Sequence, residues 1–199
     1  MRQDVSRETM ERLEVYAALL EKWNPRINLV AKSTIPEIWS RHIADSAQMY
    51  RLSSHPVGLW ADLGSGGGFP GLVIAIMAQE KGSPDAVTLV ESDTRKATFL
   101  RQVIRETGIS AQVQAKRIEQ IGPLNADVLS ARALADLSTL CSFATLHLSP
   151  SGTALFPKGA TWEKEVEEAR KAWRFDLEIV RSETDPAAVV LKLKGISRV

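Results

Sequence analysis

The feature that most constrains the fold is a glycine-rich segment between a short apolar run and a helical pattern. Residues 62–71 read Asp-Leu-Gly-Ser-Gly-Gly-Gly-Phe-Pro-Gly, and four of the five residues from Gly64 to Gly68 are glycine. Glycines let the backbone turn sharply and let a ligand approach closely. A strand, a glycine loop and a helix in succession form the ligand-binding corner of a doubly wound sheet, where helix amides face an anionic group. The segment therefore predicts an α/β fold with a nucleotide-like ligand at this loop.

The sequence after residue 58 supports that fold, because short apolar stretches alternate with longer helical ones. We expect strands at Leu59–Leu63, Ala86–Glu91, Ala111–Ala115, Asp127–Ser130 and Thr153–Pro157, and helices at Gly71–Glu80, Thr94–Thr107, Asp136–Leu146 and Thr161–Trp173. This alternation predicts a mostly parallel sheet covered by helices on both faces. The tail differs, since Phe175–Arg181 and Ala188–Lys194 are separated by a short polar turn. These two segments predict an antiparallel C-terminal hairpin.

The first 57 residues predict a helical arm. Apolar residues recur at helical spacing over residues 6–23, with Ser6 placed as the N-cap and Pro25 as the end of the helix. A second helix is expected from Thr34 and Pro36 to Tyr50. We therefore expect an N-terminal helical extension over residues 1–57, packed on a single ligand-binding domain over residues 58–199.

Composition excludes several classes of protein. The 199 residues carry 25 Lys and Arg against 24 Asp and Glu, a net charge of +1, which argues against a strongly basic protein that binds any RNA. One cysteine, Cys141, excludes a disulfide framework, and three histidines in separate segments predict no metal site. The longest apolar run, residues 72–78, is far shorter than the ~20 residues that span a bilayer. A polar N-terminus shows no secretory signal, so we expect a cytoplasmic protein without membrane contact.

Two details of the sequence favour S-adenosylmethionine over NAD as the ligand. Gly66, Gly68 and Gly71 fit the dinucleotide pattern G-x-G-x-x-G, which is weak evidence in so glycine-rich a segment. Asp62 adds the Asp-x-Gly-x-Gly-x-Gly pattern typical of class I methyltransferases, and a carboxylate suits a ligand ammonium but repels a pyrophosphate. The second detail is the hairpin tail, which is usual in that fold. Glu91, 20 residues after Gly71, is placed to accept hydrogen bonds from ribose hydroxyls of either ligand.

The methyl acceptor can be narrowed by elimination. The Asp/Asn-Pro-Pro-Tyr/Phe motif of adenine amino methylation is absent, since the position after the fourth strand reads Ser130-Ala131-Arg132-Ala133. Methylation of a pyrimidine carbon needs a cysteine nucleophile, and Cys141 lies in an apolar helix. Guanine N7 carries a free lone pair and needs alignment but no general base. We therefore assign no catalytic residue.

Beyond these residues, the chain resembles the ribosomal RNA small-subunit methyltransferase G family, also called the glucose-inhibited division protein B family. The resemblance covers roughly residues 20–194 and rests on Trp23-Asn24, Asn28-Leu29, Arg41-His42-Ile43-Ala44-Asp45-Ser46, the segment 62–71, the residues Ser130, Arg132 and Ala133, and Lys158-Gly159. It implies methyl transfer from S-adenosylmethionine to N7 of a guanosine in the decoding region of 16S rRNA. The implied partner is 16S rRNA in the small ribosomal subunit or in an assembly intermediate.

The resemblance also implies which residues bind the cofactor. It adds Gly64, Phe69, Glu91, Ser92, Ile118, Glu119 and Arg132 to Asp62 and Gly66 of the loop pattern. Ile118 and Glu119 are expected at the adenine edge. Arg132 is expected to pair either with the cofactor carboxylate or with an RNA phosphate. One departure from the family pattern is Gly67, where relatives often carry Pro or Ala.

The candidates for substrate binding are Arg41, His42, Asp45, Arg132 and Lys158. His42 and Asp45 share a helix face, where they form either a wall of the active site or an internal network that docks the arm. Two other functions remain open at this point. One is an NAD-dependent oxidoreductase with the same loop, and the other is a non-catalytic module that binds RNA or ribosomes.

Overall fold

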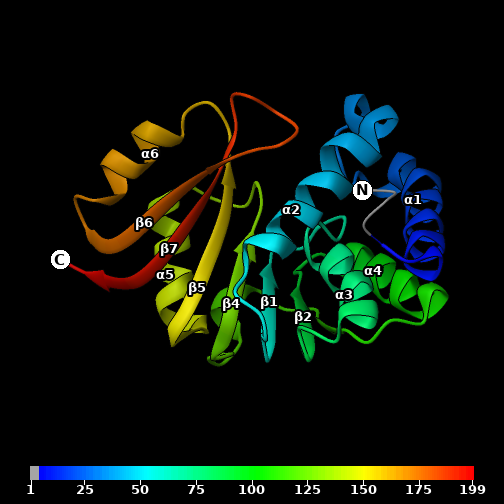
Figure 1. The fold of residues 1–199 in the computed structure, drawn as a ribbon, viewed down its shortest axis with the longest axis horizontal. Helices are drawn as coiled ribbons and strands as arrows, with labels where there is room; N and C mark the ends of the chain where they lie inside the picture. Colours follow the sequence, from blue (N-terminus) through cyan, green and yellow to red (C-terminus); the bar gives the residue numbers. More distant parts are fainter. Residues whose placement is uncertain (1–4) are drawn as a thin grey trace.

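The computed structural model describes residues 5–199, which form a seven-stranded sheet with helices on both faces (Figure 1). Its strands are β1 (Leu59–Leu63), β2 (Ala86–Val90), β3 (Gln112–Gln114), β4 (Ala126–Ala131), β5 (Leu148–Lys158), β6 (Trp173–Arg181) and β7 (Val189–Arg198). Their order across the sheet is β3-β2-β1-β4-β5-β7-β6, in which β1 to β5 are parallel and β7 is antiparallel to both neighbours. The mostly parallel sheet and the C-terminal hairpin are thus confirmed.

The helices form two groups, one on each face of the sheet. Successive side chains of a strand point to opposite faces, so neighbouring residues pack against different groups. Trp60 packs in the cluster that holds residues of α1 to α4, and its neighbour Ala61 packs in the cluster that holds residues of α5 and α6. The helices are α1 (Arg7–Ile27), α2 (Ala44–Leu52), α3 (Gly71–Lys81), α4 (Thr94–Thr107), α5 (Leu137–His147) and α6 (Trp162–Ala169), with 3₁₀ turns η1 (Lys32–Glu37) and η3 (Ile118–Gln120) and a π turn η2 (Ile38–Ile43).

The N-terminal arm differs from its expected outline in two places. Helix α1 starts at the expected cap, where Ser6 Oγ accepts a hydrogen bond from Thr9 N (3.2 Å), but continues through Pro25 to Ile27. A proline in the last turn costs the helix only one hydrogen bond, so the helix ends instead where Asn28 takes a left-handed φ of 49°. The expected second helix is three pieces, η1, η2 and α2. Pro36, which cannot donate a backbone hydrogen bond, lies inside η1 and prevents a regular α-helix there.

The arm shares one core with the sheet. Leu13 and Leu20 of α1 lie in the same buried cluster as Leu72 of α3 and Phe99 of α4. The division into an extension over residues 1–57 and a domain over residues 58–199 stays a prediction.

The bounds of the C-terminal elements differ from those expected. Helix α6 ends at Ala169, and Trp173, which was expected in that helix, begins β6.

Candidate functional site

The loop between β1 and α3 is fixed from both sides by the protein itself. Gly68 has a φ of 95°, and a Cβ there would lie 2.3 Å from Leu72 Cδ1, so no side chain fits. Ser65 N donates to the Val90 carbonyl at the end of β2 (3.0 Å). The Tyr16 hydroxyl of α1 donates to the carbonyl of Gly67 (2.5 Å).

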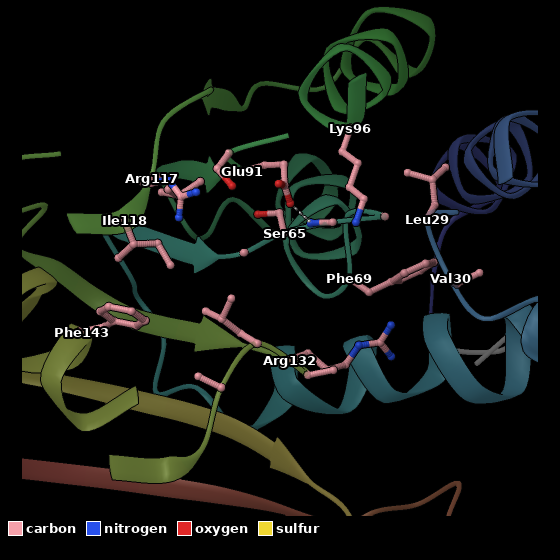
Figure 2. Close-up of a pocket in the computed structure, with 18 of the residues that line it drawn as sticks. Leu29, Val30, Ser65, Phe69, Glu91, Lys96, Arg117, Ile118, Arg132 and Phe143 are labelled. Carbon is pink, nitrogen blue, oxygen red and sulfur yellow. Dashed lines mark hydrogen bonds between the residues drawn. The ribbon is translucent and has the colours of Figure 1, made fainter. Parts of the chain in front are cut away.

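A cavity of about 780 Å³ lies beside this loop, within the size range of small-molecule sites. Figure 2 shows Ile118 and Phe143 at one end, Glu91 near the middle, and Phe69 and Arg132 towards the other end. The predicted cofactor residues that line the cavity are Gly64, Gly66, Phe69, Glu91, Ser92, Ile118, Glu119 and Arg132. The structure therefore brings together eight of the nine residues, from the ends of β1, β2 and β4 and from η3.

Asp62 is the ninth residue, and it lies behind the loop. Its side chain is fully buried, Oδ1 accepts a hydrogen bond from Ser130 Oγ (2.7 Å), and Oδ2 accepts one from Gly71 N (3.3 Å). Burial raises the pKa of the Asp62 carboxyl to about 6. Asp62 does not line the cavity. Its influence on a ligand therefore runs through the loop and the start of α3 that it holds.

Glu91 connects the glycine loop to the segment after β2. Its Oε2 accepts a hydrogen bond from Gly66 N (2.8 Å) and its Oε1 accepts one from Asp93 N (2.8 Å). The side chain is buried yet lines the cavity. A carboxylate has about four acceptor positions, so two remain for ligand hydroxyls.

Glu91→Ala is expected to weaken S-adenosylmethionine binding by about 1–3 kcal/mol, because it removes a charged acceptor and leaves Gly66 N without its partner. Calorimetric titration measures the affinity directly. Glu163→Ala, on the exposed surface of α6, is the matched control and should bind as wild type does. A folded Glu91→Ala variant with wild-type affinity would contradict the ribose role.

Phe69 forms the centre of a cluster at the end of the cavity nearest the arm. The Arg132 guanidinium lies over its ring (5.2 Å from Cζ to the ring centroid), and the rings of His42 and Tyr16 lie 5.0 and 5.1 Å away. Within residues 5–199, no carboxylate lies within 4.0 Å of the Arg132 guanidinium, and the guanidinium donates no hydrogen bond to the protein. Arg132 is thus available to an anionic group of a ligand.

His42 is a neutral wall of this cluster. Burial, Arg132 and Arg41 lower the pKa of the imidazole to about 4. The Thr34 hydroxyl donates to the Ala31 carbonyl (2.8 Å), so it accepts from His42 Nε2 (2.8 Å), which carries the proton. His42 therefore adds no positive charge to the cavity near neutral pH.

The other predicted substrate residues lie around a smaller, second cavity. Arg41, Asp45 and Lys158 line it, and Arg132 lines both cavities. Arg41 pairs with Glu37 (3.4 Å), and Lys158 pairs with Glu165 (2.6 Å). The residues predicted from the sequence to bind substrate therefore lie around two adjoining cavities.

With this geometry in view, comparison with known proteins decides the family. Residues 9–186 match the family model described as rRNA small subunit methyltransferase G. The chain belongs to this family. A Ribosomal RNA small subunit methyltransferase G from Ruegeria sp. (strain TM1040) is 55% identical over 98% of this chain and 95% of its own length. The protein of that name from Paracoccus denitrificans (strain Pd 1222) is 52% identical over 96% of this chain and 97% of its own length.

Solved structures at lower identity confirm the fold. A ribosomal protein L11 methylase from Lactobacillus delbrueckii subsp. bulgaricus aligns with a TM-score of 0.57 at 20% identity, covering 77% of this chain and 76% of its own. TYW2 of M. jannaschii in complex with AdoMet aligns with a TM-score of 0.59 at 14% identity, covering 88% and 80% of the two chains. The fold is therefore the Rossmann-like fold of methyltransferases that use S-adenosylmethionine.

Membership of the family makes the protein a small-subunit rRNA methyltransferase that uses S-adenosylmethionine. The cavity fits this cofactor, because the close turn at Gly68 keeps side chains out of the loop and the Glu91 carboxylate is held against Gly66. Cys141 is buried and lines neither cavity, and burial raises the pKa of its thiol to about 12. Cys141 is therefore a protonated packing residue in this member of the family.

Sequence reasoning missed the contribution of the arm to the cavity. Leu29, Val30 and Thr34 line it, and Asn24 shapes this segment by accepting hydrogen bonds at Oδ1 from the amides of Leu29 (2.7 Å) and Val30 (2.8 Å). The signal was present in the family motif Trp23-Asn24 with Asn28-Leu29, but spacing alone does not show that this turn reaches the glycine loop.

Within residues 5–199, no group of three or more His, Cys, Asp and Glu side chains is placed to hold a metal ion. None of the helices in the described part of the chain is long and apolar enough to cross a membrane.

Proposed function

We propose that the protein methylates N7 of a guanosine in the decoding region of 16S rRNA. The observation that carries this specificity is that, among residues 5–199, His42, Glu91 and Cys141 are each unsuited to removing a proton from the acceptor. His42 has a pKa of about 4, both oxygens of Glu91 accept backbone amides, and Cys141 lines neither cavity. Guanine N7 has a free lone pair and no proton to lose, so this acceptor suits the site.

When bound, S-adenosylmethionine supplies a methyl group on a sulfonium sulfur, which the N7 lone pair takes as the carbon–sulfur bond breaks and its electron pair stays on sulfur. The chain contributes alignment and electrostatics. Glu91 orients ribose hydroxyls, and the Arg132 guanidinium is available to the cofactor carboxylate or to an RNA phosphate. His42 stays neutral, so it does not add repulsion against a cationic sulfur.

The charge of the cofactor cavity supports a polyanionic second substrate. Lys96, Lys116 and Arg117 line the cavity, and none has an ion pair among residues 5–199. S-adenosylmethionine is itself a net cation, so binding it does not require the positive charge of these three side chains. RNA phosphates beside the target nucleotide are suitable partners for them.

The physiological partner in this proposal is the small ribosomal subunit or its assembly intermediate, in the cytoplasm. A net charge of +1 gives little general affinity for RNA, so a structured particle would supply contacts that free RNA lacks.

Labelled methyl transfer tests the proposal. The enzyme, S-adenosylmethionine and small subunits that lack the modification should give one 7-methylguanosine in 16S rRNA, mapped by chain cleavage at that base. Naked 16S rRNA should react more slowly than the particle. Calorimetric titration should show binding of S-adenosylmethionine and none of NAD. Binding of NAD alone, or S-adenosylmethionine binding without any transfer, would contradict the proposal and favour an oxidoreductase or a non-catalytic module.

A further inference from the structure

The second cavity adjoins the cofactor cavity but shares none of its glycine loop. It has a volume of about 380 Å³, and both cavities are lined by Arg132, Ala133 and Ala135 after β4. Its other walls include Asp45 of α2, Lys158 at the end of β5 and the β6–β7 turn, residues 182–188. The second cavity therefore meets the cofactor cavity at the segment after β4.

Two charged residues that line the second cavity, Lys158 and Glu165, already have hydrogen-bond partners within the protein. Lys158 Nζ donates to the Ala135 carbonyl (2.8 Å) and to Glu165 Oε2 (2.6 Å), and Glu165 Oε2 also accepts from Leu137 N (3.0 Å). The Lys158 side chain is only 9% exposed. Lys158 is thus a positioning residue that holds the loop shared by both cavities.

Asp45 presents one free oxygen to the second cavity. Its Oδ1 accepts hydrogen bonds from the hydroxyls of Ser182 (3.4 Å) and Thr184. Its Oδ2 has no donor among residues 5–199 and is not one of the buried polar atoms without a partner, and Asp45 lines the second cavity. Partial burial raises the pKa of this carboxyl.

Guanine carries N7 on one edge and its N1 and 2-amino N–H donors towards the opposite side. A base whose N7 points to the cofactor cavity therefore directs these donors away from it. We propose that the second cavity holds the acceptor guanine and that Asp45 Oδ2 accepts hydrogen bonds from its Watson–Crick donors. This inference rests on the proposed N7 specificity. It also explains discrimination against adenine, whose ring N1 is an acceptor that a carboxylate repels.

Asp45 also helps to dock the β6–β7 turn on α2. A substitution at Gln48 distinguishes this structural role from recognition of the base. Gln48 Nε2 donates to the Arg181 carbonyl (2.7 Å), and Gln48 Oε1 accepts from Glu183 N (3.1 Å), so Gln48 docks the same turn on the same helix. Gln48 lines neither cavity. If the role of Asp45 were purely structural, substitutions at Asp45 and at Gln48 would have similar effects on the rate of methyl transfer.

Asp45→Asn keeps an oxygen for the two hydroxyls but places an N–H donor where guanine needs an acceptor. We expect kcat/KM for unmodified small subunits to fall about 10- to 100-fold. Calorimetric affinity for S-adenosylmethionine and the urea midpoint should stay at wild-type values. Gln48→Ala should keep the wild-type rate. Equal rates for wild type and Asp45→Asn, or equal losses in Asp45→Asn and Gln48→Ala, would overturn the inference.

Ala188→Phe tests the location without relying on the Asp45 variant. Ala188 lines the second cavity from the β6–β7 turn and does not line the first. The larger side chain should abolish methyl transfer while leaving S-adenosylmethionine affinity unchanged. Wild-type transfer in Ala188→Phe would overturn the assignment. Absence of 7-methylguanosine with the wild-type enzyme would instead refute the proposed function itself.

Discussion

Gly71→Ala is expected to lower the free energy of unfolding by about 2–4 kcal/mol, at or above the usual cost of overpacking a core. A Cβ at this position would lie 2.2 Å from Leu89 Cδ2 and 2.9 Å from Asp62 Cβ. Both of those side chains are fully buried, so neither has free space to move into. The same change pushes the amide of residue 71 away from Asp62 Oδ2, its acceptor at 3.3 Å.

Gly122→Ala is the matched control for this substitution. A Cβ at Gly122 would meet no atom within 4 Å, and this residue is not among the glycines with positive φ. Its unfolding free energy should stay within about 0.5 kcal/mol of wild type. Urea denaturation followed by tryptophan fluorescence gives both values. Equal stabilities for the two variants would show that α3 can move away from β1 and β2 at little cost.

The parts of the fold that were predictable from sequence are those set by local pattern. The glycine loop, the strands that flank it and the alternation of strands with helices depend on residues close together in the chain. The position of β7 between β5 and β6 is different. A hairpin pattern shows that two strands pair, but it does not show which of them joins the rest of the sheet.

Asp62 shows why a correct motif does not fix a role. Its distance from Gly64 suggested a carboxylate beside the ligand, but the side chain lies behind the loop and bonds to Ser130. The register of β1 against β4 places Asp62 opposite Ser130, which is 68 residues further along the chain. Such a pairing comes from the closure of the sheet, and no spacing in the sequence encodes it.

Lys158 and the arm show the same limit. The sequence placed Lys158 at a strand end that faces the site, which is its position in the structure. The sequence could not show that the Lys158 ammonium pairs with Glu165 and donates a hydrogen bond to the Ala135 carbonyl. The cavity wall at Leu29 and Val30 likewise depends on α1 packing against α3 and α4, a contact between segments far apart in the chain.

Asp62→Asn is expected to gain stability relative to wild type as the pH rises from about 4 to about 7. Burial raises the folded-state pKa of Asp62 to about 6, whereas an unfolded Asp has a pKa of about 3.9. Between these values the native state holds a proton that the unfolded state has lost, so wild-type stability falls as the pH rises. A pKa difference of about two corresponds to roughly 3 kcal/mol. The asparagine variant has no such titration.

The wild-type pH profile alone cannot reveal this effect, because His42 titrates in the opposite sense. Its folded pKa of about 4 lies below the unfolded value, so its contribution to stability rises with pH over a similar range. The informative quantity is therefore the difference in unfolding free energy between wild type and Asp62→Asn, measured by urea denaturation at several pH values. If this difference does not vary with pH, Asp62 is ionised in the native protein at pH 4–6, and the hydrogen bonds from Ser130 and Gly71 outweigh its burial.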